Sequence, residues 1–348
     1  MAMKVNISER VLHFKQPAGT SRGVYTERRI WLVSISDGRT IGRGECAPLL
    51  DLSCDAMEPA VYNKVLRGFC DQVEQTGEIP YEEMRDYPSM LFGLETAMMD
   101  VRSKKADRKG ILFDTPFARG EQGITINGLV WMGNHEEMLQ RMEEKLKLGF
   151  RCVKLKVGAI DFDQELDLVK RIRERFSYHE VELRLDANGG FRPDEALYKL
   201  ELLSQYAIHS IEQPIKQKQW AMMAELCRES PLPIALDEEL IGISDPDAKR
   251  QMLRIIKPRY IVLKPSLHGG MMGCREWIEI AKDEGIGSWI TSALESNIGL
   301  NAIAQFCSEV YGENIKMPQG LGTGQLFTDN IPMPLEIRGD KLWISKNS

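Results

Sequence analysis

The sequence predicts an α/β protein in which a TIM-type barrel follows a smaller α+β domain. From about residue 124 to 319, short apolar stretches alternate with amphipathic ones, a pattern typical of a parallel sheet with right-handed crossovers. Seven or eight such units favour a closed barrel, since no GxGxxG motif follows the first strand as in a doubly wound sheet. Before this region, strands are followed by helices without regular alternation, which indicates a separate α+β unit.

The first unit contains two predicted strands and two predicted helices. Residues 5–14 and 29–36 alternate apolar and polar side chains, as half-buried strands do. Residues 58–75 and 90–105 carry apolar side chains at helical spacing, and the second stretch ends in basic residues that suit a helix C-terminus. Residues 15–28 mix Gly, Ser, Thr and Pro, which predicts a mobile loop.

The second unit contains seven predicted strands with a helix after each. The strands are expected at residues 124–130, 152–157, 181–186, 209–212, 234–237, 260–264 and 287–292. The helices are expected at residues 136–148, 163–176, 194–206, 220–229, 246–255, 273–283 and 298–310. The last 29 residues exceed what the barrel needs, so we expect them to return to the first domain. The predicted domains are therefore 1–118, 119–319 and 320–348.

Composition excludes several classes of partner. The chain has 45 Lys and Arg against 51 Asp and Glu, a net charge of −6, which disfavours nucleic acid or an anionic membrane. No apolar run approaches the ~18 residues that a membrane span needs. The N-terminus turns polar within ten residues, unlike a signal peptide. We therefore expect a cytoplasmic protein with a small-molecule partner, and leave homo-oligomerisation open.

Cysteine and histidine provide no recognisable metal or disulfide pattern. The seven cysteines include no CxxC pair, and the five histidines form neither HxH nor HExxH. A disulfide framework and a zinc site built on thiolate or imidazole are therefore not expected. Any metal in this protein should be held by oxygen ligands.

Charged residues stand near the ends of five successive predicted strands, on the face that alternates with apolar side chains. They are Lys156, Asp186, Glu212, Asp237 and Lys264, separated by 30, 26, 25 and 27 residues, or about one βα unit each. Because strand side chains alternate, the apolar set can face the helices while the charged set points into the barrel. One such carboxylate alone is more often a helix cap, but five matching positions indicate an active site at the barrel mouth.

These residue types point to metal-assisted proton transfer. Converging carboxylates of Asp186, Glu212 and Asp237 would repel one another unless a divalent cation neutralised them, and all-oxygen ligation suits Mg²⁺, with Mn²⁺ as the alternative. A buried lysine beside such a cation has a lowered pKa and can act as a general base. We assign that role to Lys156, with Lys154 on the same strand face helping to hold it neutral.

Together with the motifs GECAPL and GLETAMMD, these residues resemble the enolase superfamily, in its muconate-lactonizing subgroup. The resemblance covers essentially the whole chain and implies a (β/α)₇β barrel with an N-terminal capping domain. It also implies a Mg²⁺ site and a carboxylate substrate that passes through an enediolate. The subgroup's KxK motif falls on Lys154 and Lys156, its metal ligands on Asp186, Glu212 and Asp237, and its opposite lysine on Lys264.

Within the subgroup, SALES at 292–296 and GLGTGQLF at 320–327 are most similar to the o-succinylbenzoate synthases of menaquinone biosynthesis. Phe191 departs from the usual DANxxW pattern. The resemblance implies a lyase that dehydrates a 2-succinyl-6-hydroxycyclohexadiene-1-carboxylate. Lys156 would remove a proton and return it to the leaving hydroxyl, and Lys264 would stabilise the opposite face as a cation. Candidate substrate contacts are Asn188, Ser292, Glu295 and Ser296.

Two alternatives stay open. The first is an isomerase on the same scaffold, a dipeptide epimerase or N-acylamino acid racemase, in which two lysines exchange a proton across opposite faces. The DxD motif of the epimerases is absent around residues 321–328, which disfavours that reading. The second is a non-catalytic binding barrel. It is disfavoured because every expected carboxylate and lysine is present.

Overall fold

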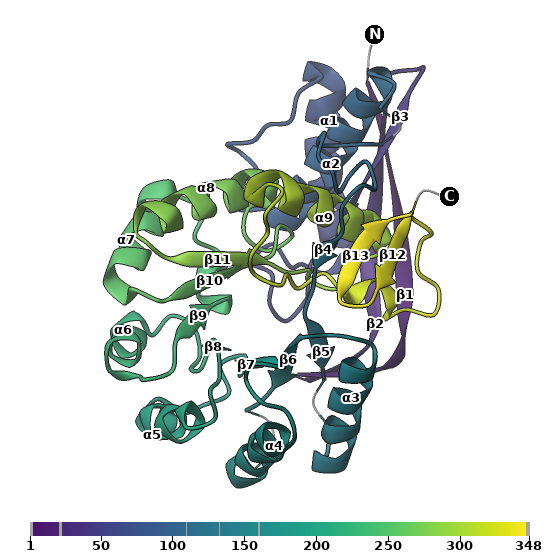
Figure 1. Cartoon of the computed structure of the whole chain (residues 1–348). Coiled ribbons are helices and arrows are strands. Elements are labelled where there is room, and N and C mark those ends of the chain that lie inside the picture. Colours follow the sequence, from purple (N-terminus) through teal and green to yellow (C-terminus); the bar gives the residue numbers. More distant parts are fainter. Residues whose placement is uncertain (1–2, 21–22, 109, 132, 159–160, 346–348) are drawn as a thin grey trace.

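Seven parallel strands form the centre of the computed structural model, which describes residues 3–20, 23–108, 110–131, 133–158 and 161–345 (Figure 1). In sheet order they are β5 (Gly128–Val130), β6 (Cys152–Lys156), β7 (Glu182–Asp186), β8 (Ser210–Glu212), β9 (Ile234–Leu236), β10 (Tyr260–Leu263) and β11 (Gly287–Ile290). The predicted α/β barrel fold is therefore confirmed. None of the helices in the described ranges has the length and apolar character that a membrane crossing requires.

One helix follows each strand and covers the outside of the barrel (Figure 1). The helices are α3 (His135–Lys147), α4 (Phe162–Arg175), α5 (Pro193–Ser204), α6 (Trp220–Glu229), α7 (Pro246–Ile256), α8 (Gly270–Asp283) and α9 (Asn297–Tyr311). Several begin with the capping chemistry that the sequence favours. In α7, for example, the Asp245 side chain accepts a hydrogen bond from the amide of Ala248, and Pro246 occupies the first turn.

The barrel is closed by two residues that form no regular strand. Between β11 and β5, the Gly320 amide donates to Ile290 O at 2.8 Å and the Gln319 amide donates to Thr125 O at 2.9 Å. The backbone of this segment lies so close to β11 that a Cβ on Gly320 would stand 2.1 Å from Thr291 Oγ1. Glycine is therefore required at the seam.

The predicted strand at 124–130 divides into two pieces that belong to different sheets. Its first part, β4 (Ile124–Thr125), pairs with β13 (Lys341–Ile344), which in turn pairs with β12 (Leu335–Arg338). Its second part is β5 of the barrel. The C-terminal hairpin is thus attached to the start of the barrel, whereas the segment before it lies on the N-terminal sheet, where the Thr328 amide donates to His13 O at 2.9 Å.

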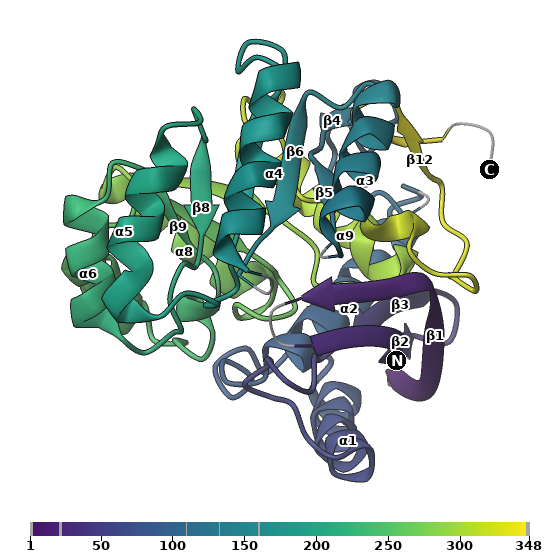
Figure 2. The same ribbon diagram turned by 90° about the horizontal axis from the view of Figure 1, so that it is seen from below.

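The N-terminal unit is a three-stranded antiparallel sheet with two helices. Its strands are β1 (Lys4–Thr20), β2 (Gly23–Ser36) and β3 (Ile41–Cys46), and its helices are α1 (Pro59–Thr76) and α2 (Pro88–Lys105). Trp31 and Tyr62 stack at its centre with ring centroids 4.2 Å apart. Figure 2 shows β1 and β2 lying across one end of the barrel.

The expectation of a mobile loop at residues 15–28 is wrong over the described residues. After an irregularity between His13 and Ala18, β1 and β2 pair again, with Ala18 opposite Tyr25 and Thr20 opposite Gly23. Gly19 and Gly23, two of the residues that predicted a loop, instead each pair with a residue of the opposite strand, and residues 21 and 22 lie outside the described residues. A two-stranded extension is held by backbone hydrogen bonds, which residues of almost any type can form. The amino-acid composition of residues 15–28 therefore did not indicate strands.

Two buried carboxylates join the cap to the barrel by capping helix N-termini. Glu95 of α2 accepts hydrogen bonds from the amides of Met271 and Met272 at the start of α8, at 2.8 and 3.2 Å. Glu45 of β3 accepts from the amides of Ser296 and Gly299 at the start of α9, at 2.8 and 2.9 Å. Helix N-termini present unpaired N–H groups and a favourable dipole to an anion. This contact accounts for the glutamate in each of the GECAPL and GLETAMMD motifs.

These carboxylates should make stability depend on pH near neutrality. Burial raises the pKa of Glu45 and of Glu95 to about 7, against about 4.3 for glutamate in an unfolded chain. The folded state therefore holds protons that the unfolded chain releases. The stabilisation of the folded state by these two carboxyl groups is fully present below about pH 4 and is lost as the pH rises through 7. We expect the unfolding temperature to fall between pH 5 and 8, and to fall less in the Glu45→Gln, Glu95→Gln double variant. If the unfolding temperature falls equally with pH in the wild type and in the double variant, Glu45 and Glu95 are not the groups responsible.

Candidate active site

A cavity of about 410 Å³ lies at the C-terminal ends of the barrel strands, where the cap meets the barrel. The cap contributes Tyr25, Leu49 and Leu52 to its wall, and the barrel contributes Lys156 and Lys264 among others. Active sites of barrel enzymes are found at this end. The wall combines apolar side chains with a few converging charged groups, as small-molecule sites do.

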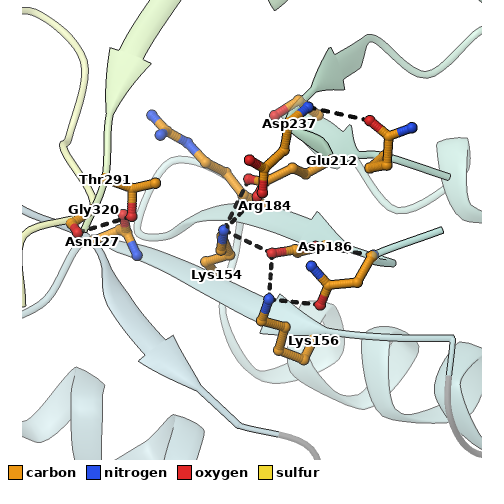
Figure 3. Close-up of polar contacts among 12 residues, drawn as sticks. Asn127, Lys154, Lys156, Arg184, Asp186, Glu212, Asp237, Thr291 and Gly320 are labelled. Carbon is orange, nitrogen blue, oxygen red and sulfur yellow. Dashed lines mark hydrogen bonds and ion pairs between the residues drawn. The ribbon is translucent and has the colours of Figure 1, made fainter. Parts of the chain in front are cut away.

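Lys154 lies at the centre of the charged cluster (Figure 3). Its Nζ contacts both carboxylate oxygens of Glu212 at 2.9 Å and Asp186 Oδ2 at 2.8 Å. Burial by itself lowers the pKa of Lys154, but the two carboxylates outweigh it and raise the pKa above its usual value. Lys154 is therefore a permanent cation in this arrangement. Neutralisation of two buried carboxylates is what allows them to stand on adjacent strands.

Lys156 lies two residues after Lys154 in β6, on the same face of the strand, and both lysines contact Asp186. Its Nζ donates to Asp186 Oδ2 at 2.6 Å and to Asn188 Oδ1 at 2.7 Å. Burial is the largest influence on its pKa and lowers it. The neighbouring Lys154 cation acts in the same direction, and Asp186 opposes both. The two lysines of one strand thus differ, because only Lys154 contacts a second carboxylate.

On the opposite side of the cluster, Lys264 Nζ contacts Asp237 Oδ2. Burial lowers the pKa of Lys264, but Asp237 outweighs it, so the net shift is upward. Both residues directly follow their strands, Asp237 after β9 and Lys264 after β10. The strand order β6-β7-β8-β9-β10 therefore places the carboxylates between the lysines, as the sequence predicts.

Two neighbours that the sequence reasoning missed hold the carboxylate-bearing loops in place. Gln213 Oε1 accepts from the amides of Asp237 and Glu239, at 3.2 and 3.1 Å, so one side chain links the ends of β8 and β9. Glu238 Oε1 accepts from Asn188 Nδ2 at 2.9 Å, which directs Asn188 Oδ1 toward Lys156. Gln213 directly follows Glu212 in SIEQP, and Glu238 directly follows Asp237 in LDEE. This adjacency to a predicted ligand was the only sequence feature that could have indicated their roles.

The predicted substrate contacts separate into two groups. Asn188 and Ser292 line the cavity, with Ser292 Oγ 2.5 Å from Thr323 Oγ1. The structure does not bring Glu295 and Ser296 to the cavity. Glu295 accepts from Ser266 Oγ at 2.5 Å and from the Ala293 amide at 2.7 Å, while Ser296 is bound to Glu45 of the cap. Of these two SALES residues, Ser296 therefore joins the barrel to the cap, and Glu295 bonds within the barrel.

The donor set fits a divalent cation, although its groups are at present paired with amines. Across the described ranges, no three Asp, Glu, His or Cys side chains are arranged to hold a metal as they stand. Lys154 contacts Glu212 and Asp186, and Lys264 contacts Asp237. One acceptor remains: Asp237 Oδ1 is buried and has no hydrogen-bond partner among the described residues. An orphaned carboxylate oxygen beside two further buried carboxylates is the chemistry that Mg²⁺ takes.

Comparison with known proteins gives matches over almost the whole chain. Residues 137–344 match the family described as enolase C-terminal domain-like, and residues 20–101 match the N-terminal domain of MenC. The chain is 44% identical to an o-succinylbenzoate synthase of Desulfotalea psychrophila, over 99% of both chains. It is also similar to the crystal structure of MenC from Desulfotalea psychrophila, with a TM-score of 0.80 and 40% identity, covering 99% of this chain and 100% of that chain.

Epimerases are more distant relatives. The L-Ala-D/L-Glu epimerase of Bacillus subtilis is 26% identical over 88% of this chain and 84% of that protein. A substrate-liganded structure of the same epimerase superposes with a TM-score of 0.83 at 21% identity, covering 99% of this chain and 96% of that chain, a likeness of fold alone.

The metal-ligand assignment can be tested by calorimetry. Glu212→Gln removes one anionic oxygen from the donor set while keeping the side-chain shape, so we expect Mg²⁺ affinity to fall by tenfold or more, about 1.4 kcal/mol. Glu180→Gln, on the surface between α4 and β7, is a matched control that should leave affinity unchanged. Unaltered Mg²⁺ binding by the Glu212 variant would remove Glu212 from the ligand set.

Proposed function

The chain belongs to the enolase superfamily and, within it, to the o-succinylbenzoate synthases, and from this premise we propose how its residues carry out the dehydration. The chain is accordingly a carbon–oxygen lyase, acting at a step of menaquinone biosynthesis. The observation that carries the function is the 44% identity over 99% of both chains. Support for the residue roles comes from three lysines that line the cavity and from the three buried carboxylates that these lysines contact.

Asp186, Glu212 and Asp237 are the residues we propose to hold Mg²⁺. When bound, the ion supplies Lewis-acid stabilisation of negative charge on the substrate carboxylate. Occupation of these oxygens requires that Lys154 and Lys264 give up part of their present contacts, and both have a flexible four-carbon stem that permits this. Asn188, through its bond to Glu238, and Gln213, through its bond to the Asp237 amide, hold the carboxylate-bearing loops in place.

Lys156 is the proposed general base. It takes the proton from the carbon next to the substrate carboxylate, and the electron pair of that C–H bond is delocalised onto the carboxylate as an enediolate until it forms the new ring double bond. The C–O bond to the hydroxyl then breaks, and Lys156 returns its proton to the departing oxygen, so that water leaves and the ring becomes aromatic. Two features support this choice over Lys154: the lowered pKa of Lys156 and its single carboxylate partner.

Lys264 is proposed to remain a cation on the opposite side of the substrate. Its pKa is raised, with Asp237 overcoming the effect of burial, so it is suited to stabilise negative charge and unsuited to accept a proton. Lys154, also held cationic, positions Asp186 and Glu212. A 1,1-proton transfer also pairs one neutral lysine with one protonated lysine, so the lysine pKa values are compatible with both reactions. The preference for the dehydratase over the epimerase or racemase rests on the 44% identity to an o-succinylbenzoate synthase.

The base assignment predicts that Lys156→Ala abolishes turnover, a loss of at least about 10³-fold, because Lys154 and Lys264 have raised pKa values and are held as cations. Mg²⁺ affinity, measured by calorimetry, should be retained, since all three ligands remain. Lys170→Ala, on the exposed face of α4, should leave turnover unchanged. Substantial activity in the Lys156 variant would exclude this lysine as the base.

The reaction itself is tested by incubating the protein with the cyclohexadiene carboxylate and Mg²⁺ and following the ultraviolet absorption of the aromatic product. We expect turnover that is lost on chelation of the metal and restored by adding it back. A parallel incubation of N-acylamino acids or dipeptides in D₂O measures exchange of the α-hydrogen. Exchange without any dehydration would support the isomerase in place of the lyase.

A further inference from the structure

The Arg28 side chain connects the cap to the barrel beside the cavity. Arg28 lies in β2 and is only 4% exposed. Its guanidinium donates to two carbonyls of the cap, Ala47 O at 2.5 Å and Pro48 O. It also donates to two carbonyls of the barrel, Ala293 O and Leu294 O, each at 3.2 Å. One planar group thus satisfies four backbone acceptors from both domains.

These four carbonyls belong to the segments that wall the cavity. Leu49 of the cap directly follows Pro48 and lines the cavity, as do Ala293 and Leu294 after β11. Leu49 and Ala293 also pack together in one apolar cluster with Leu267. The Arg28 guanidinium thus bonds to both of the segments, one from the cap and one from the barrel, that meet at this side of the cavity.

Two buried carboxyl groups, those of Glu45 and Glu295, lie near Arg28 and bind the segment that follows β11. Arg28 is the cation that faces both Glu45 and Glu295, which attract it electrostatically. Glu45 is bound to the start of α9, and Glu295 to Ser266 and the Ala293 amide. A buried guanidinium with four carbonyl acceptors has one favourable position, because any displacement leaves buried polar groups unpaired.

We propose that Arg28 is a positioning residue for substrate binding: it fixes the cap wall against the barrel wall, so that the cavity is formed before substrate enters. Arginine is required because its fork of five donors reaches several acceptors at once, which a lysine amine cannot do. Lys156 and its carboxylate partners lie on β6 to β9, outside the contacts of Arg28. The effect should therefore fall on substrate affinity and not on the proton transfer. This inference rests on the proposed function only for the choice of substrate.

The test is steady-state kinetics of the full chain with the cyclohexadiene carboxylate at saturating Mg²⁺. For Arg28→Met we expect KM to rise by about tenfold or more, with kcat changed by less than about threefold. Arg28→Lys keeps the charge but not the fork, and we expect a smaller rise of about threefold. The matched control is Arg29→Met, the next residue of β2, which pairs with Glu9 at the surface and should leave KM unchanged.

Amide hydrogen exchange supplies a readout that does not need activity. We expect faster exchange of residues 47–53 and 291–296 in Arg28→Met than in wild type or Arg29→Met. Should Arg28→Met fail to fold, the same comparison is made with Arg28→Lys. An unchanged KM and unchanged exchange in the Arg28 variants would overturn the inference. A wild type that does not convert the substrate would instead refute the proposed function, with exchange still deciding the role of Arg28.

Discussion

The balance of buried charge at the barrel mouth is the constraint on which the rest of the site depends. Three carboxylates and three lysines stand at the ends of five neighbouring strands, and each carboxylate has an amine within contact distance. Carboxylates this close would be unstable without cations, and buried amines would lose their charge without carboxylates. The same balance makes the lysines unequal. Lys154 contacts two carboxylates and stays charged, whereas Lys156 contacts one and has a lowered pKa.

The cap depends on the same physical principle, applied to helix ends. Glu45 and Glu95 supply acceptor oxygens to the N-termini of α9 and α8, and Arg28 supplies donors to the carbonyls around Pro48 and Ala293. Backbone groups that would otherwise be unpaired at the junction are thereby satisfied. As a result, the cap residues beside the cavity are fixed by buried polar contacts, and a shift of the cap would expose or orphan several of them.

Much of the site could be predicted because parallel strands impose a simple rule on the sequence. Alternation places Lys154 and Lys156 on the inner face, and spacing by one βα unit brings Asp186, Glu212 and Asp237 to the same rim. The structure brings these residues together, and a buried oxygen of Asp237 there has no hydrogen-bond partner within the part of the chain that the structure describes. Gln213 could not be assigned its role, because an amide that links two loops has no spacing rule. Glu295 and Ser296 were expected to contact the substrate. In the structure, Glu295 instead bonds to Ser266, and Ser296 bonds to Glu45 of the cap.

By itself, the sequence determined the barrel, its strand order and the face on which each charged residue lies, since these follow from local periodicity and chain length per unit. Only the tertiary structure decided how residues distant in the chain are joined. Examples are the closure of the barrel by Gln319 and Gly320, the division of 124–130 between two sheets, and the contact of Arg28 with residues more than 260 positions away. Such contacts depend on backbone groups, which every residue carries, and therefore leave no pattern in the order of side chains.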